Sequence, residues 1–135
     1  MIELTNTAQQ TIPVGGSLVF DKKLIQAGCC ECHRTNTPAV KMRQRGYYEV
    51  TFNGNIGGAT AATAVQIALQ LGGATLPETT MISVPAAAND LNNVSADTFL
   101  SNCCDDYDRI TVVNTGTVPV IVGANASIKL KRVCG

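Results

Sequence analysis

Residues 46–55 read GYYEVTFNGN, and this stretch decides the fold of the chain. Its side chains alternate, with Tyr48, Val50 and Phe52 on one face and mostly polar residues on the other. Period-two alternation with aromatic and β-branched residues is typical of a strand with one buried face. Aromatic rings bury the most surface per residue, and aromatic residues make up only 4% of this chain. We therefore predict the central strand of a β-sandwich, followed by an Asn53-Gly54 hairpin turn.

The rest of the chain divides into short segments with strand patterns, separated by turns rich in glycine, proline and asparagine. The further strands that we expect are residues 9–14, 17–20 with an extension over 22–27, 39–43, 64–71, 78–85, 109–114, 118–122 and 127–133, with a loop at 86–96. About eight to ten short strands, with turns roughly every 8–12 residues, are typical of all-β sandwiches, barrels and jelly rolls. We see no linker and no internal repeat, so we predict a single jelly-roll domain over residues 1–135.

The apolar faces of these strands predict one hydrophobic core. Its expected members are Tyr48, Val50, Phe52, Val65, Ile67, Leu69, Ile110, Val112, Val120 and Leu130. A chain of 135 residues is long enough to bury a single core of this kind.

Residues 64–71 are the segment in which helix and strand compete. Alanine and leucine favour a helix, but Val65, Ile67 and Leu69 alternate strictly with small or polar residues, and a helix would scatter them around its circumference. We therefore predict a strand. Its opposite face is small and uncharged, which suits packing against another subunit better than contact with water. The oligomer interface that we predict contains Gln66, Ala68, Gln70 and Tyr47.

The composition limits the classes of function. Lysine and arginine together number 10, aspartate and glutamate also 10, and charged residues make up 15% of the chain, against about a quarter in average domains. Nucleic-acid binding needs a basic face, whereas a neutral, weakly charged chain suggests a surface partly covered by other subunits. We find no run of about 18 apolar residues for a membrane helix and no secretory signal. We expect no nucleic-acid or membrane partner.

Several stretches resemble the jelly rolls of the tumour necrosis factor and complement globular-head superfamily. GYYEVTF at 46–52 is similar to the glycine–aromatic–aromatic central strand of that family, and VQIALQLGG at 65–73 is similar to the next strand and its glycine turn. DRITVVNTG and VPVIVGANASIKLKRV, within 108–133, resemble the final pair of strands. GCC at 28–30 and NCC at 102–104 together resemble a group of small phage and prophage structural proteins with such a domain.

This resemblance implies a homotrimer that is not an enzyme. In phages such domains serve as capsid decoration or fibre-head modules, so it implies a virion structural protein, made in the host cytoplasm and exposed after release. Other capsid or tail proteins are the expected partners. The alternative is a carbohydrate-binding jelly roll that recognises cell-surface or mucosal glycans, because the fold also hosts lectins. The lack of tryptophan, a common sugar-stacking residue, argues against this alternative.

The cysteines are even in number, which permits disulfides without fixing their pairing. They are Cys29, Cys30, Cys32, Cys103, Cys104 and Cys134. The pairs at 29–30 and 103–104 each stand at the end of a strand run, and such ends gather at one rim of a sandwich, so we expect at least one disulfide. Buried thiols and a thiolate metal site are the alternatives, but Cys-x-Cys departs from the usual Cys-x₂₋₄-Cys of structural zinc. We expect no metal and no cofactor.

A nucleophilic cysteine activated by His33 is the enzymatic alternative. Neighbouring strand residues point to opposite faces, so Cys32 and His33 diverge. The enzymatic case also rests on one residue, because the chain contains a single histidine. We therefore predict no catalytic residue.

We interpret two clusters of charged residues as solvent-exposed parts of the surface without a binding role. Asp105, Asp106 and Asp108 carry calcium-binding carboxylates but lack the spacing of a calcium loop, so we interpret them as a solvated turn. The residues at 41, 43 and 45 form a small basic strand face that we interpret as solvated.

Overall fold

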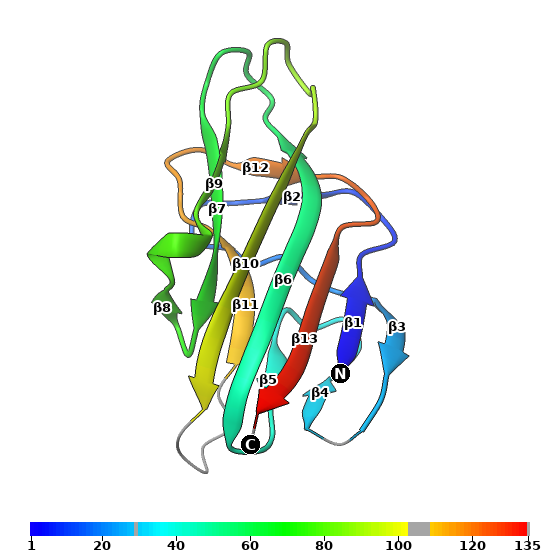
Figure 1. Ribbon diagram of the computed structural model, residues 1–135. Helices are drawn as coiled ribbons and strands as arrows, with labels where there is room; N and C mark the ends of the chain where they lie inside the picture. Colours follow the sequence, from blue (N-terminus) through cyan, green and yellow to red (C-terminus); the bar gives the residue numbers. More distant parts are fainter. Residues whose placement is uncertain (29, 103–108, 135) are drawn as a thin grey trace.

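The structure is a computed structural model, and it describes residues 1–28, 30–102 and 109–134. Within these residues the chain forms two antiparallel sheets and a single turn of 3₁₀ helix at Pro77–Thr79. Sheet A contains β1 (Ile2–Thr5), β2 (Gln10–Ile12), β3 (Lys22–Gln26), β6 (Gly46–Gly57), β10 (Asn92–Asn102), β12 (Val120–Val122) and β13 (Ser127–Cys134). Sheet B contains β4 (Glu31–His33), β5 (Val40–Met42), β7 (Val65–Leu71), β8 (Ala74–Thr75), β9 (Met81–Ser83) and β11 (Arg109–Asn114) (Figure 1). The architecture is the predicted all-β jelly-roll sandwich.

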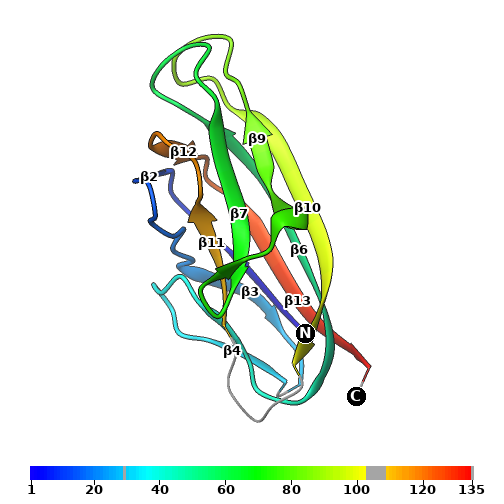
Figure 2. The ribbon, with the colours of Figure 1, turned by 90° about the vertical axis from the view of Figure 1, so that its left-hand side faces the viewer.

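Strand β6 is the centre of sheet A, as its pattern predicts. It pairs along its length with β10 on one side, and with β13 and then β12 on the other. The sheet continues from β13 to β1 and β3, and from β12 to β2. Sheet B has the order β4-β5-β11-β7-β8, with β9 also pairing with β7. Figure 2 shows sheet B, with β7 and β11 in front, covering the inner face of sheet A.

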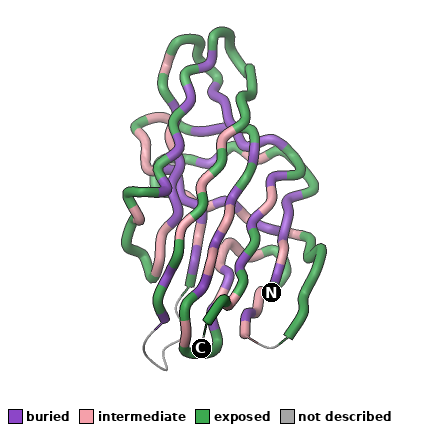
Figure 3. The backbone as a smooth tube through the Cα atoms, viewed as in Figure 1, coloured by how far each residue is buried: buried purple, intermediate pink, exposed green. Residues whose placement is uncertain are grey.

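The core lies between the two sheets, and every one of the predicted core residues belongs to it. Tyr48, Val50 and Phe52 on β6 are fully buried, as are Val65, Ile67 and Leu69 on β7. Segment 65–71 is therefore a strand, as predicted, and not a helix. Figure 3 shows buried and exposed residues alternating along the central strands. One face of each central strand thus packs inward, and the other is left for solvent or a partner.

The predicted hairpin turn at Asn53-Gly54 is wrong. Strand β6 continues through both residues, and Asn53 pairs with Ser95 on one side and with Ser127 on the other. A type I′ turn needs positive φ at both central residues, and neither residue has it. A Cβ at Gly54 would lie 3.0 Å from the Cβ of Ala126 and 3.1 Å from the ring of Phe52. The glycine therefore makes room in the core.

Two strand boundaries differ from prediction because apolar side chains reach the core. Strand β10 begins at Asn92, inside the predicted loop 86–96, and Val94 and Ala96 pack against the core. Residues 2–5, for which we predicted no strand, form β1, whose Ile2 and Leu4 are fully buried.

Two predicted strands are shorter than expected. Segment 17–20 forms only isolated bridges, of Ser17 with Val113 and of Phe20 with Thr37. Segment 78–85 begins in the 3₁₀ turn, and only its middle forms β9. The predicted acidic turn at 105–108 lies outside the described residues.

Candidate functional site

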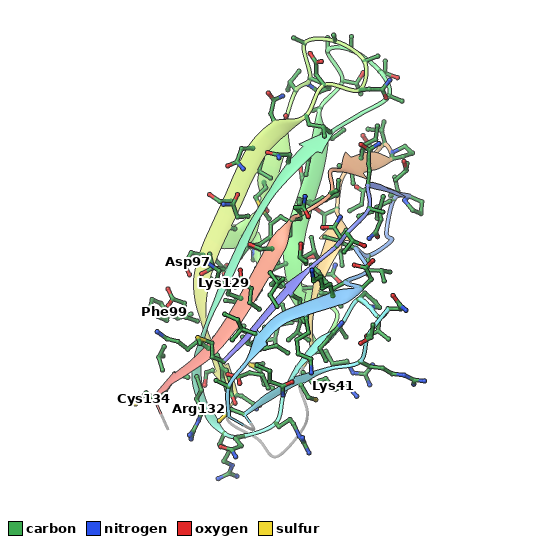
Figure 4. The ribbon with its side chains drawn as sticks, turned by 90° about the vertical axis from the view of Figure 1, so that its right-hand side faces the viewer. Lys41, Asp97, Phe99, Lys129, Arg132 and Cys134 are labelled. Atoms are coloured by element: carbon green, nitrogen blue, oxygen red, sulfur yellow. The ribbon has the colours of Figure 1, made fainter. Side chains whose placement is uncertain are left out.

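The outer face of sheet A is crossed by rows of side chains. Residues that pair directly on neighbouring strands share a face of the sheet, so the register assigns the outward positions of all five central and edge strands. One row runs through Asp97, Thr51, Lys129, Glu3 and Ile25, on β10, β6, β13, β1 and β3 in turn. The next row contains Phe99, Glu49 and Lys131. Figure 4 shows Asp97, Phe99 and Lys129 on this one side of the sandwich.

Apolar side chains stand at both ends of these rows. At one end, Phe99 on β10 is 69% exposed and Tyr47 on β6 is 55% exposed. Met1 and Ile25 are exposed at the opposite end, over β1 and β3. They border a pocket of about 200 Å³ whose floor and walls include Glu49, Thr51, Lys129 and Lys131. Exposed apolar patches with a polar surround mark interaction sites, and aromatic residues are enriched in interface cores.

Between these apolar ends, negative side chains lie on one pair of strands and positive side chains lie on the next strand. Glu49 and Asp97 lie on β6 and β10, whereas Lys129 and Lys131 lie side by side on β13. The hydrogen bond and the repulsion between the carboxyl groups of Glu49 and Asp97 raise the pKa of Glu49, and the positive charge of Lys131 partly opposes this. Glu49 and Asp97 therefore form an acidic half of the face on β6 and β10, and Lys129 and Lys131 form a basic half on β13, which is bordered by Glu3 of β1.

These charged groups contact their neighbours on the same face. The hydroxyl of Thr51 donates a hydrogen bond of 3.2 Å to Asp97 Oδ1, and Lys129 Nζ lies 4.0 Å from Glu3 Oε2. Both contacts are solvent-exposed, and exposed ion pairs contribute little to stability.

The rest of the face is polar and uncharged. Asn93 Nδ2 donates hydrogen bonds of 2.9 Å to Asn53 Oδ1 and 3.2 Å to Asn55 Oδ1. Ser95 and Ser127 flank Asn53 in the register. The outer face thus changes along β6 from aromatic and charged near Tyr47 to amide and hydroxyl groups near Asn55.

The residues predicted for the oligomer interface lie on two different faces. Tyr47 is on the outer face of sheet A, but Gln66, Ala68 and Gln70 are on the outer face of sheet B. Ala68 is fully buried within the chain. The side-chain amides of Gln66 and Gln70 donate hydrogen bonds to Thr115 and Thr75. Tyr47 and these β7 residues therefore lie on opposite faces of one chain, and the interface that we predict from them stays a prediction.

The described cysteines are spread over different environments. Cys30 and Cys32 carry free thiols; Cys30 lies in a bend before β4, packs against the core and donates a hydrogen bond to Gln44 Oε1. Cys32 instead lines a surface pocket on sheet B. Cys134 is exposed near the end of β13. Positions 29, 103 and 104 lie outside the described residues, so the disulfide between the two cysteine pairs stays a prediction.

The ring of His33 is held by backbone carbonyl groups, and within the described residues it contacts Ala39 and Phe20. Its Nδ1 lies 2.9 Å from the carbonyl oxygen of Ala39, and its Nε2 lies 3.0 Å from that of Phe20. The ring also meets the ring of Phe20 edge to face. A backbone carbonyl oxygen thus lies within hydrogen-bond distance of each ring nitrogen. This geometry suits a structural clasp between β4 and the Phe20 segment.

Sequence reasoning missed two features of the molecule. The buried carboxylate of Glu31 lies 2.6 Å from the amino nitrogen of Met1 and accepts a hydrogen bond of 3.1 Å from the Arg132 backbone N–H. Nothing in the local pattern distinguishes it from an exposed strand residue. The acidic pair Glu49–Asp97 was also missed, because residue 97 was expected at the border of a loop. The alternation of Val94, Ala96 and Leu100 with the polar residues Ser95, Asp97 and Ser101 was the available signal.

The described part of the chain has neither a metal-ligand cluster nor a membrane-spanning helix. In residues 1–28, 30–102 and 109–134, no group of three His, Cys, Asp or Glu side chains is placed to hold a metal ion. Among the same residues, no helix is long and apolar enough to cross a membrane.

Comparison with known proteins identifies the fold. No protein-family model matches the chain, and no curated protein matches its sequence. The globular domain of zebrafish complement 1qA superposes with a TM-score of 0.74 at 12% identity, over 98% of this chain and 95% of that one. Murine APRIL at pH 5.0 superposes with a TM-score of 0.68 at 14% identity, over 96% of each chain. The chain therefore has the jelly-roll fold of complement globular heads and tumour necrosis factor-like proteins.

Proposed function

We propose that the chain is a non-enzymatic structural module that assembles as a homotrimer through the outer face of sheet A. The observation that carries this proposal is the combination on one face of exposed aromatic side chains with an acidic half and a basic half. Phe99 and Tyr47 supply apolar area at a strand face that water would otherwise cover. Interface cores are enriched in such aromatic residues.

The sorting of charge specifies how copies would meet. The acidic half, Glu49 and Asp97, lies beside the basic half, Lys129 and Lys131, on the same face. A head-to-tail contact places the acidic half of one copy against the basic half of the next, and such contacts close into a ring when the rotation closes. Complementary charges steer the encounter and fix its register. The resemblance to tumour necrosis factor and complement-head domains, which implies trimers, supports a ring of three.

The oligomeric state in solution tests this proposal. Light scattering at micromolar concentration is expected to give three times the chain mass of 14.2 kDa. Phe99→Ser removes the most exposed aromatic from the face and is expected to yield monomers. Ile82→Ser is the matched control, because Ile82 is 58% exposed but pairs with Gln66 on sheet B. A monomeric wild type, or equal masses for the two variants, would contradict the proposal.

We also propose that the assembled module belongs to a virion, as capsid decoration or a fibre head, with other capsid or tail proteins as partners. The support is the resemblance of GCC at 28–30 and NCC at 102–104 to phage and prophage structural proteins. The test is to separate particles from a producing culture on a density gradient and probe the fractions with an antibody against the chain. Detection only in soluble fractions free of particles would contradict a virion role.

A further inference from the structure

A pocket on the outer face of sheet B is lined by positive side chains. It has a volume of about 440 Å³ and lies at the edge formed by β4, β5 and the start of β11. Its lining includes Arg34, Lys41 and Arg109, together with Cys32 and the apolar pair Pro38 and Ala39. No aspartate or glutamate is among the described residues that line it. Of the predicted basic strand face, Lys41 lines this pocket, whereas Arg43 and Arg45 lie beyond the end of β5 and do not line it.

The register places these side chains next to one another. Cys32 pairs directly with Lys41, and Lys41 pairs directly with Arg109, so the three lie in one row on one face. Like charges directly opposite each other on neighbouring strands are destabilising. Within the described residues, the side chains of Arg34, Lys41 and Arg109 make no ion pair that offsets this repulsion. The buried carboxylate of Glu31, on the same strand β4 as Cys32, lies on the inner side of the sheet and is held by Met1 and Arg132.

We propose that this pocket binds an oxyanion group, sulfate or phosphate, carried by a small saccharide. Arginine guanidinium groups bind oxyanions through paired hydrogen bonds, and lysine adds a point charge. A concave site lined by charges of one sign concentrates ions of the opposite sign. The volume lies within the range of about 300–1,000 Å³ that is usual for small-molecule pockets. Pro38 and Ala39 offer an apolar edge beside the cations, which suits the C–H face of a sugar better than a bare ion.

The pocket is separate from the face that we propose for self-association. Figure 4 shows Lys41 on the opposite side of the sandwich from Asp97, Phe99 and Lys129. Assembly through sheet A would therefore leave the pocket of every subunit open to solvent. Repeated sites on one assembly raise the avidity for a ligand that is displayed many times on a surface. This last consequence rests on the proposed trimer, but binding to one pocket does not.

Calorimetry at constant ionic strength tests binding, with a sulfated disaccharide, its unsulfated parent and inorganic sulfate as the three probes. We expect saturable binding of the sulfated disaccharide, weaker binding of inorganic sulfate and none of the neutral sugar. Lys41→Gln and Arg109→Gln are each expected to weaken binding about tenfold or more, as loss of one charge-assisted hydrogen bond implies. Lys22→Gln, which makes the same charge change on β3, should leave binding unchanged.

The thiol of Cys32 reports where the ligand sits. Alkylation by N-ethylmaleimide, followed residue by residue by mass spectrometry, should slow at Cys32 in the presence of the sulfated disaccharide. The rate at Cys30, which lies on the core side of the chain, should not change. Repeating the titration with the Phe99→Ser chain keeps this test independent of self-association, because the pocket should bind equally well in a monomer.

Several results would overturn the proposal. No saturable binding of any anion would do so, as would equal binding by wild type and Lys41→Gln, or loss of binding in Lys22→Gln alone. Tighter binding of a short DNA duplex than of the sulfated disaccharide, at matched charge, would assign the cations to nucleic acid and contradict a saccharide site. Binding of inorganic sulfate as tight as that of the disaccharide would remove the sugar from the proposal.

Discussion

Strand β6 has two faces with different physical roles. Its inner face presents Tyr48, Val50 and Phe52, all fully buried between the sheets, whereas its outer face presents Tyr47 and Glu49 beside Phe99 of β10. Both faces carry aromatic rings on the same hydrogen-bonded backbone. Only the inner rings are removed from water within the chain, so only they contribute the full free energy of burial, about 25 cal/mol per Å² of apolar area. The comparison shows that residues on the inner face of β6 stabilise the fold of one chain, whereas residues on its outer face are available for contact with another copy.

Phe52→Ala tests the inner face and should have the largest effect. We expect a loss of about 3–5 kcal/mol in the free energy of unfolding, because the ring is fully buried and its removal leaves a cavity. Tyr47→Ala is the matched control on the outer face, with an expected loss below about 1 kcal/mol. Denaturant titration measures both, in a chain that also carries Phe99→Ser so that assembly does not contribute. Equal losses for the two substitutions would erase the distinction between the faces.

Gly54→Ala tests how tightly the inner face is filled. We expect a loss of about 1–3 kcal/mol in the free energy of unfolding, since an added methyl group overpacks the core. The close neighbours are the Cβ of Ala126 and the ring of Phe52, at 3.0 and 3.1 Å. The same substitution in a Phe52→Leu chain should cost less, because the shorter side chain leaves room for the methyl group. A double-mutant cycle measures this coupling, and zero coupling would mean that the ring does not limit the space.

The fold was predictable because the alternation of apolar and polar side chains along a segment is a local pattern, and it matches the buried and exposed faces of the strands. The patterns of segments 46–52 and 65–71 placed the central strands and their buried faces correctly. The failures came where a tertiary constraint overrides local chemistry. Asn53-Gly54 has the composition of a turn, but its glycine is needed for clearance inside a long strand. Local sequence contains no measure of that clearance.

The site was less predictable because it depends on which strands become neighbours. Glu49 and Asp97 are far apart in the sequence, and only the pairing of β6 with β10 brings their carboxyl groups together. The same holds for Lys41 and Arg109, which the pairing of β5 with β11 places side by side. The alternation of each strand predicts which side a residue faces, but the order of strands in a sheet is not a local property.

Glu49→Gln tests the acidic half of the outer face through pH. Asp97 raises the pKa of Glu49 above its ordinary value of 4.5, so the folded chain binds this proton more tightly than the unfolded chain does. The resulting stabilisation is complete below the ordinary pKa and is lost as pH rises through the raised pKa. At neutral pH the variant should therefore melt at a higher temperature than its parent, and this advantage should shrink as pH falls toward 4.5.

The measurement is thermal unfolding from pH 7 downward, again in the monomeric Phe99→Ser chain. Asp97→Asn is the control, because it removes the repulsion from the other side and should give a similar neutral-pH gain. In the assembling chain the same Glu49→Gln change should instead raise the concentration needed for trimers, since the acidic half loses a charge. If Glu49→Gln raised the melting temperature of the monomeric chain but did not raise the concentration needed for trimers, this would contradict a role for Glu49 in the head-to-tail contact.

Asn93→Ala tests the uncharged part of the outer face and should have the smallest effect. Asn93 donates hydrogen bonds to Asn53 and Asn55, but all three side chains are exposed. Water replaces exposed hydrogen bonds at little cost, so we expect a change within about 0.5 kcal/mol in the free energy of unfolding of the monomeric chain. Denaturant titration measures this change, and light scattering of the assembling chain shows whether the amide row also lies in the contact. An unchanged trimer would confine the contact to the aromatic and charged rows, whereas dissociation would extend it along β6 toward Asn55, because amides that are exposed in one copy lose water only when a second copy covers them.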